Sequence, residues 1–174
     1  EKEIKSWLAN EKFNTLFDAI HAAAAKQITS IDVPDNVQET EPIMLTTHLQ
    51  KTRIEDMFIQ VGKNSVITIV DRTTAGEEQL FHSKRVYLSL AEGATVNYIT
   101  KQELSQNTYQ VQKKHARLAK GSRLQWIDHH RGGKIVQYLT KTELDGQDAE
   151  VRSKSLLNAA GEQCVDVCTE ALHN

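Results

Sequence analysis

The sequence predicts a mainly β protein in which strands stack in successive coils after an N-terminal helical segment. Three observations support this fold class. A strand–turn–strand theme occurs four times in residues 58–151, each copy carries a glycine in its turn, and its strands alternate apolar with polar residues. The four glycines, Gly62, Gly93, Gly121 and Gly146, are 31, 28 and 25 residues apart. Such quasi-regular spacing is typical of solenoids, in which one unit cannot bury its own apolar face.

Residues 1–27 are predicted to form the helical segment. Their apolar residues recur at spacings of three and four, which indicates an amphipathic helix. These residues are Trp7, Leu8, Phe13, Leu16, Phe17 and Ile20. Asn14 is a suitable N-cap that would divide the segment into two helices. We expect the segment to cover an end or a side of the coils and to bury Trp7, Phe13, Leu16 and Phe17.

Residues 28–174 are predicted to form the β domain. Pro34-Asp35-Asn36 is a turn signal, and residues 86–90, 95–98 and 135–139 alternate with a period of two, as strands with one buried face do. A sandwich, a barrel or a β-helix would each suit many short strands. The recurring turns and the near absence of two-residue hairpin signals favour a parallel β-helix. The expected core residues are Val61, Val66, Leu88, Leu90, Val96, Tyr98, Leu118, Leu124, Trp126, Leu139 and Val151.

The composition argues against several classes of protein. A length of 174 residues suits one domain, and 21 basic and 23 acidic residues give a net charge of -2. That charge favours neither nucleic acid nor an anionic membrane as a partner. No apolar stretch reaches the roughly 18 residues that span a bilayer, and no signal-peptide pattern opens the chain. Two cysteines are too few for a secreted disulfide scaffold, so we expect a cytoplasmic protein.

Two pairs of residues are the weak candidates for metal binding. His129 and His130 follow Asp128, but neighbours in a strand point to opposite faces, so a polar, exposed turn is the simpler interpretation. Cys164 and Cys168 would share one face of a strand about 13 Å apart, at roughly 3.3 Å per residue, which is too far for a disulfide or a shared metal. In a helix the two cysteines would be neighbours. The alternation around them favours a strand, and we expect both to be buried. No catalytic, cofactor-binding or metal site is assigned.

One basic run is interpreted as a solvated face of a coil, with a docking surface for an acidic partner as the alternative. It contains Lys113, Lys114, His115, Arg117, Lys120 and Arg123. Two other functions are considered for the whole chain. A carbohydrate-active β-helix enzyme would need paired carboxylates, and the available ones show no obvious pair: Glu77, Glu78, Glu92, Asp128, Asp145, Asp148 and Glu150. A metal-binding β-helix module would use the histidine and cysteine pairs.

Several segments, in order, resemble the SufB/SufD proteins, the scaffold subunits of the SUF iron–sulfur cluster assembly machinery. The similar segments are residues 13–21, 31–43, 58–70, 129–133, 142–151 and 172–174. The resemblance implies a right-handed parallel β-helix that acts as a non-enzymatic scaffold. It also implies two partners, a SufB-like paralogue and a SufC-like ATPase. No cofactor is expected in this chain, because an iron–sulfur cluster would be handled transiently by the full complex.

The resemblance favours SufD over SufB. SufB-type proteins carry a cysteine just after the strand that corresponds to Val66–Val70, and residues 69–73 contain none. Family members are far longer, so we expect a partial chain, truncated at the C-terminal end relative to the family. Its last coil would then expose unpaired backbone, and we expect the chain to form a homo-oligomer.

Overall fold

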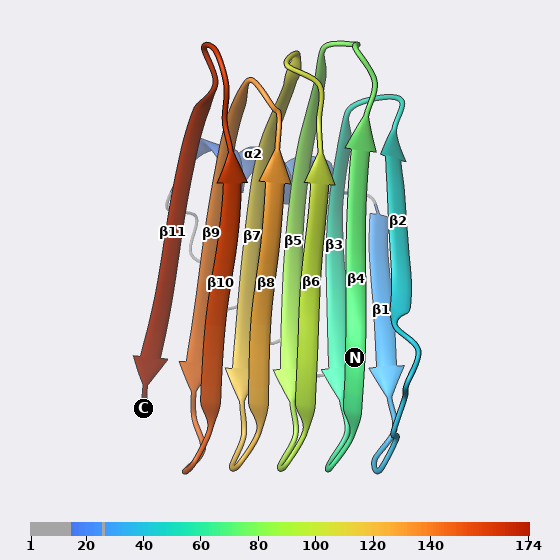
Figure 1. Ribbon diagram of the computed structural model, residues 1–174, viewed down its shortest axis with the longest axis vertical. Helices are drawn as coiled ribbons and strands as arrows, with labels where there is room; N and C mark the ends of the chain where they lie inside the picture. Colours follow the sequence, from blue (N-terminus) through green and yellow to red (C-terminus); the bar gives the residue numbers. More distant parts are fainter. Residues whose placement is uncertain (1–14, 26) are drawn as a thin grey trace.

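The computed structural model describes residues 15–25 and 27–174. They form a parallel β-solenoid with one short N-terminal helix (Figure 1). The elements are α2 (Leu16–Ala24), β1 (Gln27–Val33), β2 (Ile43–Leu49), β3 (Arg53–Val61), β4 (Val66–Ala75), β5 (Leu80–Leu90), β6 (Thr95–Glu103), β7 (Thr108–Leu118), β8 (Arg123–Arg131), β9 (Ile135–Leu144), β10 (Glu150–Asn158) and β11 (Cys164–His173).

Odd-numbered and even-numbered strands form two separate sheets. The six-stranded sheet has the order β1-β3-β5-β7-β9-β11, the five-stranded sheet has the order β10-β8-β6-β4-β2, and every pairing is parallel. Ile43 pairs with Ile69 and Val61 pairs with Leu90. One turn of the solenoid therefore takes 26 to 29 residues, and the predicted parallel β-helix is confirmed.

The four repeated glycines lie in the short turns that lead from the six-stranded to the five-stranded sheet. Gly62, Gly93, Gly121 and Gly146 each follow an odd-numbered strand. Backbone hydrogen bonds stack these turns on one another, for example from the Gly93 N–H to the Lys120 carbonyl at 2.9 Å. The predicted coil period is thus set by turns that stack along one side of the solenoid.

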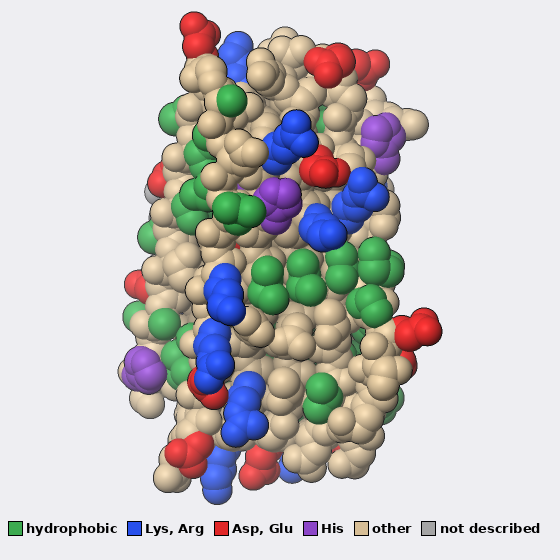
Figure 2. All heavy atoms as spheres, in the orientation of Figure 1, with side chains coloured by type: hydrophobic (Ala, Val, Ile, Leu, Met, Phe, Trp, Pro, Cys, Tyr) green, Lys and Arg blue, Asp and Glu red, His purple; other side chains and the backbone are tan. Residues whose placement is uncertain are grey.

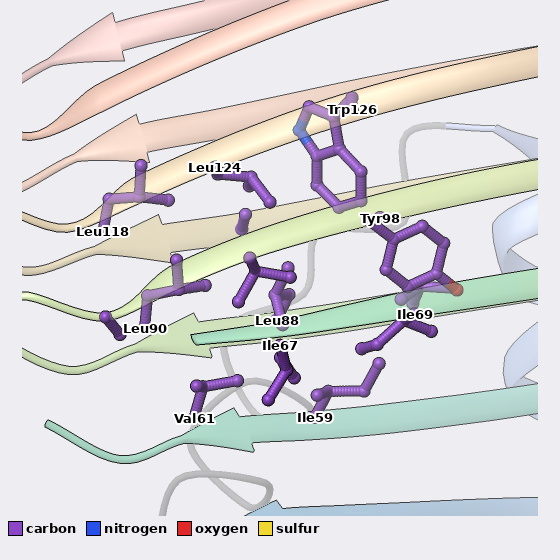
Figure 3. Close-up of a cluster of buried hydrophobic side chains, with 14 of the residues drawn as sticks. Ile59, Val61, Ile67, Ile69, Leu88, Leu90, Tyr98, Leu118, Leu124 and Trp126 are labelled. Carbon is purple, nitrogen blue, oxygen red and sulfur yellow. The ribbon is translucent and has the colours of Figure 1, made fainter. Parts of the chain in front are cut away.

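The main apolar core lies between the two sheets, next to the glycine turns (Figure 3). Each strand alternates, so residues such as Ile59, Ile67 and Leu88 point inward and are fully buried. Tyr98 and Trp126 meet edge to face with ring centroids 5.2 Å apart. Burying one such side chain contributes roughly 1.5–3 kcal/mol.

Most of the predicted core is confirmed, with two errors. Val66 is 38% exposed and Leu139 is only partly buried. Both face outward, because alternation along β4 and β9 turns the neighbouring Ile67 and Tyr138 toward the interior. Val151 is partly buried and packs against the core.

Helix α2 packs on the outer face of the six-stranded sheet mainly through polar side chains, with one aromatic contact in which Phe17 stacks on Phe81 at 6.3 Å between ring centroids. Thr15 caps the helix in a capping box with Asp18, and the buried residues of the helix are Asp18 and His21. Leu16 and Phe17 are 74% and 44% exposed, so their predicted burial is wrong. The predictions for Trp7, Phe13 and the cap Asn14 lie outside the described residues.

The outer face of the sheet explains this polar contact. His21 hydrogen-bonds through Nδ1 to Ser83 Oγ at 2.7 Å and through Nε2 to Asp56 Oδ1 at 3.2 Å. Arg85 donates to the same Asp56 carboxylate at 2.7 Å, and Asp18 pairs with Lys113. The sheet thus presents charges to the helix at these outward positions. No helix in the described part of the chain is long and apolar enough to cross a membrane.

Candidate functional site

The interior of the solenoid becomes polar away from the glycine turns. The inward positions that are apolar next to the glycine turns carry charged and amide side chains further along the same strands. The buried residues of this layer, here called the polar layer, are Glu55, Asp71, His82, Lys84, Gln102, Gln110, Gln112, Lys114, Asp128, His130 and Tyr138. Buried groups of this kind must be paired, because an isolated charge in a dry interior is very costly.

Two buried lysine–aspartate pairs link the two sheets. Lys84 Nζ lies 2.7 Å from both carboxylate oxygens of Asp71, and both residues are 1% exposed. The Tyr98 hydroxyl donates to Asp71 Oδ2 at 2.8 Å. Lys114 pairs with Asp128, and its Nζ lies 4.4 Å from the centroid of the Trp126 ring. Burial lowers the pKa of Lys114, although the Asp128 carboxylate opposes this effect.

A chain of hydrogen bonds begins at the edge of the polar layer. Arg53 donates to Glu55 Oε2 at 2.8 Å, and His82 Nε2 lies 3.0 Å from Glu55 Oε1. Burial raises the pKa of Glu55, but the bonds from His82 and Arg53 and the charge of Lys84 outweigh it and lower the pKa to about 2. Since Glu55 is ionised, His82 donates through Nε2. Its Nδ1 then accepts from Gln110 Nε2 at 2.9 Å, so His82 is neutral, in agreement with the pKa that burial lowers.

The chain continues to the far side of the polar layer. The Tyr138 hydroxyl lies between Gln110 Oε1, at 2.8 Å, and Gln102 Oε1. His130 Nδ1 lies 3.1 Å from the same Gln102 oxygen, and its ring stacks on Tyr138 with centroids 3.6 Å apart. Burial lowers the pKa of His130 to about 4, although Asp128 opposes this. The polar layer therefore holds fixed charges and neutral imidazoles, and it cross-links the two sheets.

The histidine pair does not form a shared site. His130 points into the polar layer, whereas His129 faces outward and is half-buried. The prediction that neighbouring histidines point to opposite faces is confirmed. The interpretation as an exposed turn is wrong, because both residues belong to β8 and Asp128 and His130 are buried.

The cysteine pair lies on the outer face of the six-stranded sheet. Both residues belong to β11, as the predicted strand requires, but both are exposed, so the predicted burial is wrong. Cys164 and Cys168 pair in register with Ile135 and Leu139, which also face outward. Among the described residues, no three His, Cys, Asp or Glu side chains gather in a way that could hold a metal ion.

The basic run is divided between the two faces of β7, the turn after it, which holds Lys120, and the start of β8, which holds Arg123. Lys114 points into the polar layer, so the interpretation of the whole run as a solvated face is wrong for this residue. Lys113 faces outward and pairs with Asp18 of α2. Alternation along a strand separates these neighbours, and the same alternation was the signal that could have revealed Lys114 and the polar layer.

The carboxylates considered for a carbohydrate-active site are not gathered into one place. Asp128 is buried and paired with Lys114. Glu92 lies in the turn after β5, 3.9 Å from Lys63, and Asp145 accepts a hydrogen bond from Asn174 in the turn after β9.

The last turn of the solenoid is open. In β10 and β11 the inward positions Ser153, Ser155, Val167 and Thr169 are exposed, whereas their counterparts in earlier turns are buried. Leu156 and Leu157 are also exposed. Within the described residues, β10 and β11 each pair on one side only. This end therefore presents two free strand edges beside an uncovered interior, which is a template for further pairing.

Comparisons with known proteins agree with this architecture. The family model described as "SUF system FeS cluster assembly, SufBD core domain" matches residues 44–174. An iron–sulfur cluster assembly SufBD family protein of Mycobacterium leprae is 28% identical over 123 residues, which are 70% of this chain and 14% of that protein. One from Staphylococcus saprophyticus is 22% identical over 170 residues, which are 95% of this chain and 36% of that protein.

The chain thus spans about a third or less of the length of these relatives. No solved structure matches it. The family model covers three quarters of the residues, including every strand from β3 to β11. The chain therefore belongs to the SufBD core domain family of the SUF iron–sulfur cluster assembly system.

Proposed function

We propose that this chain is the SufD-like part of a scaffold subunit in SUF iron–sulfur cluster assembly, and that it acts in the cytoplasm through protein contacts instead of catalysis. The match of residues 44–174 to the SufBD core domain carries the proposal. The architecture supports it, because a solenoid with pairs of charged residues buried between its sheets is a rigid body that presents long faces and free strand edges.

The SufD-like assignment rests on strand β4. SufB-type proteins carry a cysteine just after the segment that corresponds to Val66–Val70, the first half of β4. Residues 69–73 of this chain contain no cysteine. The two cysteines of the chain lie far along the sequence, on the outer face of β11. We propose that sulfur is received by a SufB-like paralogue and that this chain supports it.

The proposed partners are a SufB-like paralogue and a SufC-like ATPase, with the cluster held transiently by the assembled complex. The test is co-expression of the tagged longer parent protein with both partners, followed by native mass spectrometry. The proposal expects one assembly that contains all three proteins. A parent protein that is recovered alone, while the other two form a complex without it, would overturn the proposal.

The chain by itself is proposed to pair with a second copy through the open last turn. In a parallel strand, the N–H and C=O of alternate residues point to opposite sides. The Cys164 N–H donates to the carbonyl of Lys134, just before β9, and the Asn174 N–H donates to that of Leu144 at the end of β9. The odd-numbered residues between them therefore direct their N–H groups to the free edge. Thr169→Pro removes one such donor and leaves the pairing with β9 intact, whereas Thr169→Ala keeps it.

Light scattering measures this association. Wild-type protein and Thr169→Ala are expected to show a mass near twice 19.6 kDa at high concentration. Thr169→Pro is expected to shift the population toward the monomer. A wild-type chain that is strictly monomeric contradicts this pairing.

A further inference from the structure

The outer face of the five-stranded sheet carries an apolar stripe. Met44, Val70, Ile99 and Ile127 are register partners on four adjacent strands and all point away from the interior. Figure 2 shows a row of hydrophobic side chains, in green, across the middle of the face in view. Met44 is 58% exposed and the others are half-buried. The stripe runs across the strands, along the axis of the solenoid.

A basic row lies two residues further along the same strands. Arg72, Lys101 and His129 are register partners, and Figure 2 shows blue and purple side chains gathered above the stripe. The outward positions of this sheet carry two acids, Glu103 and Glu150. They also carry six cations: Arg72, Lys101, Arg123, Arg131, Arg152 and Lys154. Six minus two gives a local charge of +4 on a chain of net charge -2.

Only part of this charge is neutralised within the sheet. Arg72 pairs with Glu103 at 3.2 Å, and Arg152 and Arg123 share Glu150 at 2.7 and 3.6 Å. Within the described part of the chain, Lys101, Arg131 and Lys154 have no acidic partner. An apolar stripe beside uncompensated cations is complementary to a ligand that has an apolar face and an acidic face next to it.

We propose that this face docks an acidic amphipathic helix of a partner protein, laid along the solenoid axis. The backbone groups of the sheet are already paired between strands, so a ligand on this face meets side chains only. Adjacent strands are about 4.8 Å apart, close to the 5.4 Å pitch of a helix. Apolar residues at positions i, i+4, i+7 and i+11 would therefore rest on Met44, Val70, Ile99 and Ile127 in turn.

The acidic flank of the same helix would meet Arg72, Lys101 and His129. Single-stranded nucleic acid fits less well, because such sites combine charge with aromatic stacking platforms. The outward positions of β2, β4, β6, β8 and β10 contain no Phe, Tyr or Trp. The inference is independent of the pairing at the open last turn, since it concerns a face and not an edge.

The test is titration of the purified chain with a fluorescent 18-residue helical peptide, followed by anisotropy. The peptide carries leucine at the four stripe positions and glutamate along one flank, and a scrambled peptide of the same composition is the control. Lys101→Glu and Ile99→Thr change the basic row and the stripe without touching the interior. Lys51→Glu, in the turn after β2, and Ile135→Thr, on the outer face of the other sheet, are the matched controls.

We expect the designed peptide to bind and the scrambled peptide to bind at least about fivefold more weakly. Lys101→Glu and Ile99→Thr should each weaken binding about fivefold, and the two control variants should bind as wild type does. No binding, or equal losses in the control variants, overturns the proposal. The proposal is also overturned if the peptide does not bind while an oligonucleotide or phosphatidylserine vesicles do, and if Lys101→Glu weakens the binding of that other ligand about fivefold.

Discussion

Asp71→Asn is the most informative perturbation of the interior. It removes the negative charge that faces Lys84 Nζ at 2.7 Å while it keeps the shape of the side chain. Both residues are 1% exposed, so solvent cannot replace the lost partner. Removing one member of a buried ion pair costs about 3–5 kcal/mol. The free energy of unfolding of a domain is about 5–15 kcal/mol. This single change should therefore remove a large part of the stability of the fold.

A matched surface pair provides the control. Glu103→Gln removes the partner of Arg72 at 3.2 Å, but these side chains are 46% and 51% exposed. Surface pairs contribute about 0–1 kcal/mol. The double variant Asp71→Leu/Lys84→Met should recover part of the loss, because a buried pair replaced by apolar residues is often neutral in stability. The recovery is incomplete because the buried Tyr98 hydroxyl loses its acceptor, Asp71 Oδ2, at a cost of about 1–3 kcal/mol.

Urea unfolding followed by circular dichroism measures these differences. We expect the midpoint for Asp71→Asn to fall by several times the change for Glu103→Gln, with an unchanged slope. If Asp71→Asn and Glu103→Gln differ by less than about 1 kcal/mol, the claim that the polar layer is dry and paired is wrong.

Three further predictions concern pH, a turn and the helix. Glu55 has a pKa of about 2 in the fold against an ordinary 4.5, and His130 has about 4 against 6.5. Because the unfolded chain binds each proton first, stability should fall by about 3 kcal/mol as pH drops from 6.5 to 4 and by about 3 kcal/mol more from 4.5 to 2. In urea titrations across pH, Glu55→Gln should reduce the second loss and leave the first unchanged. Part of the second loss should remain, because the pKa values of Asp56 and Glu143 are lowered as well. Gly132→Ala places a Cβ 1.8 Å from the Leu104 carbonyl oxygen, whereas Gly121→Ala meets nothing within 4 Å, although both have positive φ. Thermal unfolding should therefore show a much larger loss for Gly132→Ala, and equal losses would contradict the turn geometry. His21→Ala removes the contacts of α2 with Ser83 and Asp56, at a cost of about 1–3 kcal/mol, so limited proteolysis should release the N-terminal segment faster than in a Leu16→Ala control.

The coil architecture could be predicted because it depends on local, repeated signals. The regular spacing of four glycines predicts where the turns lie: Gly62, Gly93, Gly121 and Gly146. The alternation of strands such as β6 predicts which side chains face the interior. The apolar character of Val66 and Leu139 predicts that they belong to the core, whereas the parity of β4 and β9 turns them outward. Parity is a better guide to burial than the type of one residue.

The polar layer could not be predicted from hydrophobicity, because its residues look like surface residues. Asp71, Lys84 and Lys114 continue the inward parity of strands that are apolar nearer the glycine turns. Whether such a position is buried depends on which charge stands opposite it on the other sheet, and this partner is distant in sequence. The same reason explains helix α2, whose buried Asp18 and His21 meet partners on three different strands.

For the cysteine pair, the strand could be predicted from the sequence but the burial could not. The alternation around Cys164 and Cys168 predicts a strand, which is confirmed, and burial, which is wrong. They pair with outward residues of β9, and within the described residues no strand covers the free edge of β11. Their exposure follows from the outward parity that they share with Ile135 and Leu139, the same parity that places Leu139 outside the core.

The most direct measurement of the proposed role is the activity of iron–sulfur enzymes in cells depleted of the parent protein and re-supplied with it. We expect depletion to lower these activities while the enzyme polypeptides remain abundant, and we expect re-supply to restore them. Unchanged activities in depleted cells in which the SUF system is the only assembly route would contradict the proposed role.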